Sequence, residues 1–225
     1  DANVDNNSIN NSFNGAILVS NNQRKRINIK NNTITNTSLM LGMGLFWSDS
    51  DLKTIVAKTD TTTASNYINI INNTIINCGL TGIQFQGSNV TIRRNVIDSF
   101  LRTIDDGGGI YTYTNNQTLN TLNFRNRLID SNFISNAIGA PKGANGSIDV
   151  CGYYMDDQTA NVTGLHNTIF NVPGNGMQMN TPHDNIFIDN TVYNVAAAMS
   201  LNKRFVAEVY NNVVKSNVLY QKDSS

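Results

Sequence analysis

The chain has 225 residues and no net charge, with 16 basic and 16 acidic side chains. Charged residues make up 14% of it, against about 25% in an ordinary soluble domain. This neutral balance excludes the basic surface that nucleic acid or an anionic membrane would need as a partner. No apolar run reaches the roughly 18 residues of a membrane span. Because composition does not change along the chain, we predict a single domain over residues 1–225.

Asparagine is the most distinctive residue, with 39 copies placed at fixed offsets from Ile and Val. The clearest repeats read INIKNNTITN at 27–36 and INIINNTIIN at 68–77. The gaps between the pivotal asparagines are 25, 41, 22, 37, 35, 23 and 22 residues. A base unit of about 22 residues indicates a repeat architecture with three enlarged units. The pivots are Asn7, Asn32, Asn73, Asn95, Asn132, Asn167, Asn190 and Asn212.

Within each unit the apolar residues alternate in twos, which predicts strands. A coil of this size buries its apolar face only by stacking on its neighbours. We therefore predict an all-β fold, a right-handed parallel β-helix of about eight coils with long loops on coils two, four and five. We expect each pivotal Asn to adopt a left-handed turn conformation and to form an amide ladder between coils.

The chain begins at Asp1 inside the repeat pattern, so we expect a fragment or processed part of a larger protein. We expect it to act outside the cell, in a periplasm, or on a cell or virion surface. Cys78 and Cys151 lie two coil steps apart, about 9.6 Å, beyond the roughly 7 Å reach of a disulfide. We predict two buried free thiols.

A later strand of each coil carries the candidate binding residues. Alternation directs Phe85, Thr112 and Met155 inward and the intervening residues outward. Tyrosine on a half-exposed strand needs no function, but rings and amides together suit a saccharide track. The enlarged segments 48–66, 99–108, 114–126 and 137–151 would wall this track, which favours the functional interpretation. The outward set is Gln84, Gln86, Tyr111, Tyr113, Tyr154, Asp156, Gln178 and Asn180.

Two acidic pairs, Asp105-Asp106 and Asp156-Asp157, point to the same track. Glycoside hydrolysis needs one carboxylic acid and one carboxylate, about 5 Å apart for retention and about 6.5–9.5 Å for inversion. Neighbouring like charges also raise one pKa, as a general acid requires. The alternatives are plain turn chemistry or a Ca²⁺ site. We predict all four as catalytic candidates, with no cofactor or metal ligand and Ca²⁺ as the one alternative.

His183, Lys203 and Arg204 follow two further strands and could bind substrate at the far end of the track. A lyase would use such a base and cations on a uronic acid polymer. A lone His is more often structural, and the zero net charge favours a hydrolase over a lyase.

The run Asp105-Asp106-Gly-Gly-Gly-Ile-Tyr111, followed by Tyr154-Met-Asp-Asp157, resembles the D-x-G-A-I-Y and Y-L-D-D motifs of the pectin-lyase-like superfamily. That group includes β-helical glycoside hydrolases. The resemblance implies that Asp106 and one of Asp156 or Asp157 are the catalytic carboxylates. It also implies a polysaccharide or oligosaccharide as partner. Phage tailspikes and adhesins use the same solenoid, so a non-catalytic glycan-binding domain is a further alternative, with a homotrimer expected for a tailspike.

Overall fold

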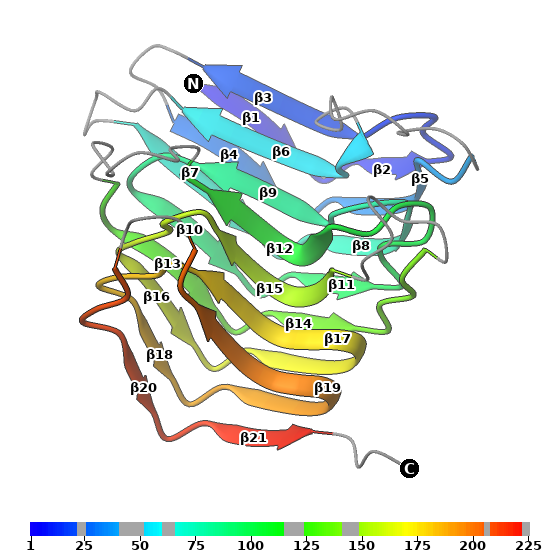
Figure 1. The fold of residues 1–225 in the computed structure, drawn as a ribbon. Coiled ribbons are helices and arrows are strands. Elements are labelled where there is room, and N and C mark those ends of the chain that lie inside the picture. The colour runs from blue at the N-terminus through cyan, green and yellow to red at the C-terminus, as the bar shows by residue number, and fades with distance from the viewer. Residues whose placement is uncertain are drawn as a thin grey trace.

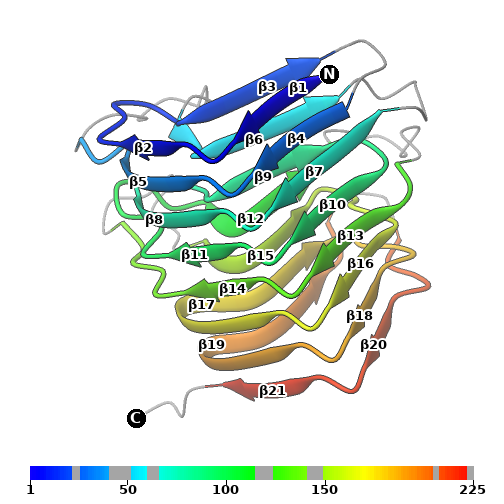
Figure 2. The same ribbon diagram turned by 180° about the vertical axis from the view of Figure 1, so that it is seen from behind.

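The computed structural model describes residues 1–21, 26–40, 52–59, 66–114, 124–140, 149–204 and 208–221. Over these residues the chain winds as a parallel β-helix with three strand faces (Figures 1 and 2). Neighbouring strands on each face come from successive coils, and every pairing is parallel, as in β1 with β4 or β12 with β15. The predicted all-β solenoid is confirmed.

The first face contains one strand from each of eight coils among the described residues, which confirms the predicted number of coils. Its strands are β1 (Ala2–Asp5), β4 (Arg26–Lys30), β7 (Tyr67–Ile71), β10 (Val90–Arg93), β13 (Arg127–Asp130), β16 (Val162–Leu165), β18 (Ile186–Ile188) and β20 (Val213–Lys215).

The second face follows each of these strands after a sharp corner, and the third face completes the coil. The second face consists of β2 (Ser8–Asn10), β5 (Thr33–Thr37), β8 (Thr74–Cys78), β11 (Val96–Asp98), β14 (Phe133–Ser135), the first halves of β17 (Thr168–Asn180) and β19 (Thr191–Asn202), and β21 (Val218–Gln221). The third face consists of β3 (Ile17–Asn21), β6 (Ile55–Thr59), β9 (Ile83–Gln86), β12 (Gly107–Tyr113), β15 (Val150–Asp156) and the second halves of β17 and β19.

An asparagine ladder holds the corner between the first and second faces. In each step the backbone N–H and the side-chain Nδ2 of one Asn donate to Oδ1 of the Asn in the next coil, as from Asn95 to Asn132 at 3.0 and 2.9 Å. The Nδ2 group also donates to a strand carbonyl of the preceding coil, as from Asn95 to Ile70 at 2.9 Å. Each buried amide is thereby satisfied from both neighbouring coils, as burial requires.

Two details of the predicted corner are wrong. Asn190 donates to Asn217, whereas Asn212 pairs with Asn185 in a separate ladder, so the last pivot is Asn217. The left-handed conformation belongs to the residue before each pivot, such as Asn31 at φ 55°, and to the residue four positions after it, such as Asn36 at φ 58°. The pivot is instead fixed by its side chain.

Glycines mark the corner where the second face turns toward the third. A Cβ on Gly152 would lie 2.4 Å from Cγ2 of Ile169 and 2.6 Å from the carbonyl oxygen of Gly176. Gly82, Gly109 and Gly176 meet the same obstruction from the next coil. The seventh coil, whose strand is the last on the third face in the described chain, carries Ala198 in this register. The small residue is therefore required where another coil stacks below.

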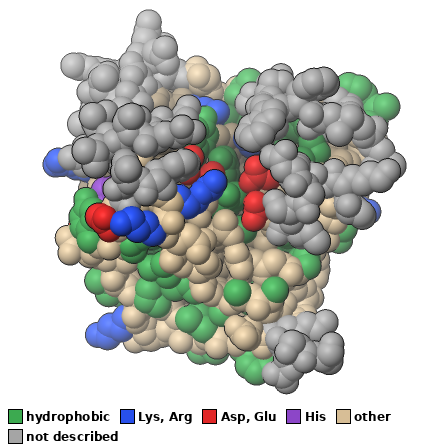
Figure 3. Space-filling model, viewed as in Figure 1, with side chains coloured by type: hydrophobic (Ala, Val, Ile, Leu, Met, Phe, Trp, Pro, Cys, Tyr) green, Lys and Arg blue, Asp and Glu red, His purple; other side chains and the backbone are tan. Residues whose placement is uncertain are grey.

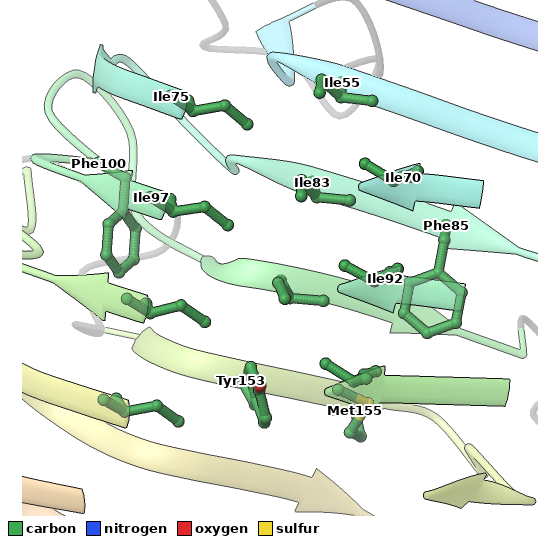
Figure 4. Packing of buried hydrophobic residues seen from close by; sticks show 14 of the residues in the cluster. Ile55, Ile70, Ile75, Ile83, Phe85, Ile92, Ile97, Phe100, Tyr153 and Met155 are labelled. Carbon is green, nitrogen blue, oxygen red and sulfur yellow. The ribbon is translucent and has the colours of Figure 1, made fainter. Parts of the chain in front are cut away.

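The core fills the inside of the solenoid with isoleucines, and Figure 4 shows Ile70, Ile75 and Ile83 pointing inward from the three faces. The predicted inward positions are buried from Ile83 to Met179. Leu201, on the last strand of the third face, is 40% exposed, although alternation places it inside. In the described chain no further strand stacks on this end of the third face, and this explains the difference.

Parts of three of the four enlarged segments lie outside the described residues, namely 48–51, 60–65, 115–123 and 141–148. Whether they wall the third face stays a prediction. So does the single domain over 1–225.

Candidate functional site

The third face presents two outward columns, each with one residue per coil. Column one is Val56, Gln84, Tyr111, Tyr154 and Gln178; column two is Lys58, Gln86, Tyr113, Asp156 and Asn180. The strand register thus confirms that the predicted outward residues line up across coils. Figure 3 views this face and shows acidic and basic side chains gathered over its upper part, above a lower part that is mostly uncharged.

The two columns differ in burial. Gln84 and Tyr154 of column one are buried, with 0% and 2% of their surface exposed, whereas Tyr113 and Asp156 of column two are partly exposed. The sequence predicts outward orientation for both columns but not that column one is covered. Apart from Asn180, which is 1% exposed, the residues of column two are partly exposed and form the accessible edge of the site.

Three tyrosines form one aromatic cluster. The ring of Tyr111 stacks on Tyr113 with centroids 5.7 Å apart and meets the edge of Tyr154 at 5.3 Å. Two cations cover the cluster on the side of the preceding coils: Nζ of Lys53 lies 5.1 Å from the Tyr111 centroid, and Nζ of Lys58 lies 6.0 Å from that of Tyr113. Cations over aromatic faces are attracted by the ring quadrupole.

Asp156 is the most connected carboxylate of the site. Its Oδ1 accepts hydrogen bonds from Nδ2 of Asn180 at 2.6 Å and from the backbone N–H of Asp157 at 2.9 Å, and lies 3.6 Å from Nη1 of Arg204. Its Oδ2 accepts from the Tyr111 hydroxyl at 3.4 Å. Asp156 therefore joins the aromatic cluster, the amide of column two and the basic side chain.

The carboxyl group of Asp157, the residue after Asp156, has a shifted pKa. Burial and the negative charge of Asp156 raise the pKa of the Asp157 carboxyl, while the charge of Arg204, whose Nη1 lies 3.9 Å from Oδ1, opposes the rise. A raised carboxyl pKa is what a general acid needs near neutral pH.

The two tyrosine hydroxyls lie within the electrostatic influence of acids from both pairs. Burial raises the pKa of Tyr111 and of Tyr154 far above the usual value, and the charges of Asp156 and Asp106 add to the rise. Both phenols are therefore protonated at neutral pH; the Tyr111 hydroxyl donates to Asp156, and the Tyr154 hydroxyl accepts from Nδ2 of Asn180 at 3.4 Å.

Asp105 and Asp106 stand at the beginning of β12. Asp105 is buried, and Asp106 is exposed in a left-handed conformation with φ 65°. The backbone N–H groups of Asp106 and Gly107 donate to the carbonyl of Asp149 in the next coil. Asp106 is thus an exposed residue of the bend that precedes β12.

The remaining predicted residues separate into those joined to the cluster and those bonded elsewhere. Nε2 of Gln86 donates to the carbonyl of Tyr113 at 3.4 Å, and Oε1 of Gln178 accepts from Asn175 and from Sγ of Cys151. Nδ1 of His183 bonds to Asp184, its ring stacks on Tyr210, and Lys203 pairs with Glu208. Of the three residues predicted at the far end, Arg204 contacts the carboxylates.

Comparison with known proteins identifies the family to which the fold belongs. Residues 1–152 match the family model described as right handed beta helix region. The chain belongs to this right-handed β-helix family. No curated protein and no solved structure matches the chain. The match confirms the predicted right-handed winding. Because this family is defined by its fold, membership gives no reaction, and the hydrolase motifs stay a resemblance.

Sequence reasoning missed one buried cation of this β-helix. Arg127 is inward at the start of β13, where its guanidinium donates to Oγ1 of Thr112 at 2.6 Å and to the carbonyl of Ala160 at 2.9 Å. It also lies over the rings of Phe85 and Phe124. Burial lowers the pKa of Arg127 to about 9. The strand register pairs Arg127 with Val90 and Val162, which are both inward positions. This alignment was the signal that could have predicted an inward arginine.

The described residues of the β-helix contain no group of three or more His, Cys, Asp or Glu side chains arranged to hold a metal ion. Within the same residues no helix is long and apolar enough to cross a membrane.

Proposed function

We propose that this β-helix binds a polysaccharide on its third face and hydrolyses a glycosidic bond there. The observation that carries the proposal is the carboxyl pair at the end of β15. Asp157 has a raised pKa beside Asp156, and Asp156 is hydrogen-bonded to Tyr111 and Asn180. Glycoside hydrolysis uses two carboxyl groups, and the one that acts as general acid needs a raised pKa.

In this proposal Asp157 is the general acid that protonates the leaving oxygen, and Asp156 or Asp106 is the second carboxylate. Asp106 is included because its charge, like that of Asp156, acts on the hydroxyls of both Tyr111 and Tyr154. The tyrosine cluster provides the apolar surface on which a pyranose ring packs. Asn180 and Arg204 position Asp156.

The tyrosines favour a hydrolase over a lyase. A lyase that used Tyr111 or Tyr154 as its base would need a lowered phenol pKa, and both are raised by burial and by the nearby carboxylates. Arg204 could neutralise a uronate, but its nearest charged partners here are Asp156 and Asp157.

The test replaces Asp106, Asp156 and Asp157 singly with Asn and measures release of reducing ends from a panel of plant and bacterial polysaccharides. We expect the variants of the acid and of the true second carboxylate to lose about 10²–10⁴-fold in rate. Asp5→Asn is the matched control, because Asp5 is an exposed carboxylate on the first face.

Three outcomes contradict the proposal. Full activity in all three variants removes the assignment of the carboxylates. Products that carry a new ultraviolet-absorbing double bond indicate a lyase. Binding of a glycan with no product from any polymer indicates a non-catalytic binding domain.

A further inference from the structure

Gln84, on the third face, is a buried amide that has no hydrogen-bond partner among the described residues. It lies on β9 in column one, and its side chain is 0% exposed. Among the described residues neither its Nε2 nor its Oε1 makes a hydrogen bond. Buried amides are almost always satisfied, because an unsatisfied one destabilises the folded state. Gln84 therefore calls for an explanation other than stability.

The neighbours of Gln84 place it inside the site. In the parallel register it stands between Val56 of the preceding coil and Tyr111 of the next, at the inter-strand spacing of about 4.8 Å. Tyr111 in turn donates to Asp156. A sugar packed on the tyrosine cluster would thus bring its neighbouring residue over Gln84.

The chemistry of the amide selects the group it would bind. Oε1 only accepts and Nε2 only donates, so a partner that satisfies both must donate and accept at once. Two adjacent sugar hydroxyls do this, whereas a carboxylate or sulfate offers acceptors alone. We propose that Gln84 is a specificity-determining residue that binds a vicinal diol of a neutral sugar residue, one subsite away from the carboxyl pair. This inference rests on the proposed function.

Access to this subsite requires a side chain to move. Nζ of Lys53, a residue only 5% exposed, lies 5.1 Å from the centroid of the Tyr111 ring, and Tyr111 is the register neighbour of Gln84. The long flexible stem of lysine allows the ammonium to leave the ring. An entering sugar would then replace the cation on the ring.

The test uses Gln84→Met, which keeps the size of the side chain and removes both polar atoms. We expect Tm to rise by about 2–4 °C, because an unsatisfied amide is lost. Gln178→Met is the matched control in the same column: its Oε1 accepts from Asn175 and Cys151, so its replacement lowers Tm.

Binding is measured by calorimetry with xylan, glucomannan and arabinan, each native and fully O-acetylated, and with polygalacturonate as the anionic comparison. We expect wild-type protein to prefer a native polymer over its acetylated form. Gln84→Met should weaken binding of that native polymer about tenfold and leave the acetylated form unchanged.

Four results overturn the inference: a fall in Tm for Gln84→Met, wild-type protein that binds none of the native polymers, unchanged affinity in the variant, or a larger loss for polygalacturonate. The two proposals fail separately. Hydrolysis that depends on the carboxylates but not on Gln84 removes the subsite alone, whereas Gln84-dependent binding without product removes the hydrolase alone.

Discussion

At the scale of single residues, folding shifts the carboxyl pKa values of Asp157 and Asp130 in opposite directions. Burial and the charge of Asp156 raise the pKa of Asp157. Burial acts in the same sense on Asp130, but hydrogen bonds from His166 and Ser131 and the charge of Arg93 outweigh it and lower the pKa of that carboxyl. One ionised carboxylate therefore destabilises the folded state, and the other stabilises it.

We predict that Asp157→Asn raises Tm at pH 7. Because folding raises this pKa, stability is lost as pH rises from the unfolded value of about 3.9 through the folded value. The gain should therefore vanish at the lowest pH at which both proteins fold. Thermal unfolding monitored by circular dichroism across this range measures it.

Asp130→Asn is the comparison with the opposite sign. The stabilisation that the Asp130 carboxylate gives to the wild-type protein is present above the unfolded pKa and is lost as pH falls through the lowered folded pKa. This variant should be less stable than wild type at pH 7 and approach it in acid. Equal pH profiles for the two variants would contradict both assignments.

At the scale of elements, the asparagine ladder determines how coils stack. Asn95 is 0% exposed, donates to Asn132 and Ile70, and accepts from Asn73. Asn7 occupies the same register on the first coil but is exposed and donates to Asn32 alone among the ladder residues. Position along the ladder therefore decides how many buried groups depend on one amide.

We predict that Asn95→Ala lowers the free energy of unfolding by about 3 kcal/mol, because it leaves donors and acceptors of both neighbouring coils unsatisfied. Asn7→Ala should cost less than about 1 kcal/mol. Urea unfolding of the two variants measures the difference. Equal losses would show that the ladder adds little to what the strands provide.

At the scale of the whole molecule, one apolar cluster runs through the solenoid from Ile17 to Val195. Both cysteines are free and buried, as the sequence predicts. Burial raises the pKa of the Cys78 thiol to about 12 and that of Cys151 well above its usual value. Neither forms the reactive thiolate while the core is intact.

We predict that neither thiol reacts with a disulfide reagent at pH 8 in the native protein, and that both react over one urea range. The reason is that both are buried between stacked coils: Cys78 belongs to the apolar cluster, and Cys151, two coils further on, is 0% exposed with its Sγ bonded to Gln178. Fully unfolded protein, which should release two equivalents at once, is the control. A thiol that reacts before the loss of circular dichroism would show that coils open independently.

The fold was predictable because its signals are local. Alternation in twos and recurrent Asn lie within ten residues of each other, and stacking repeats them. The last pivot was predicted wrongly for the same reason. Asn212 and Asn217 are each followed by a Val, so local sequence does not separate them, and only the hydrogen bond from Asn190 identifies Asn217 as the pivot.

The site was predictable only as a set of columns. That Arg204 reaches Asp156 depends on the turn after β19, where its backbone N–H donates to Oγ1 of Thr181. That Gln84 is fully buried does not follow from alternation, which places it outward. Neither leaves a periodic pattern, so neither could be read from the residues alone.

The ladder also bears on how such a protein can change over generations. Successive ladder asparagines are separated by 22 residues in one coil and 41 in another, yet their amide bonds stay between 2.8 and 3.1 Å. Closing a longer loop costs little additional entropy. Coils can therefore gain or lose residues without disturbing the frame, and new specificities can evolve while the scaffold stays the same.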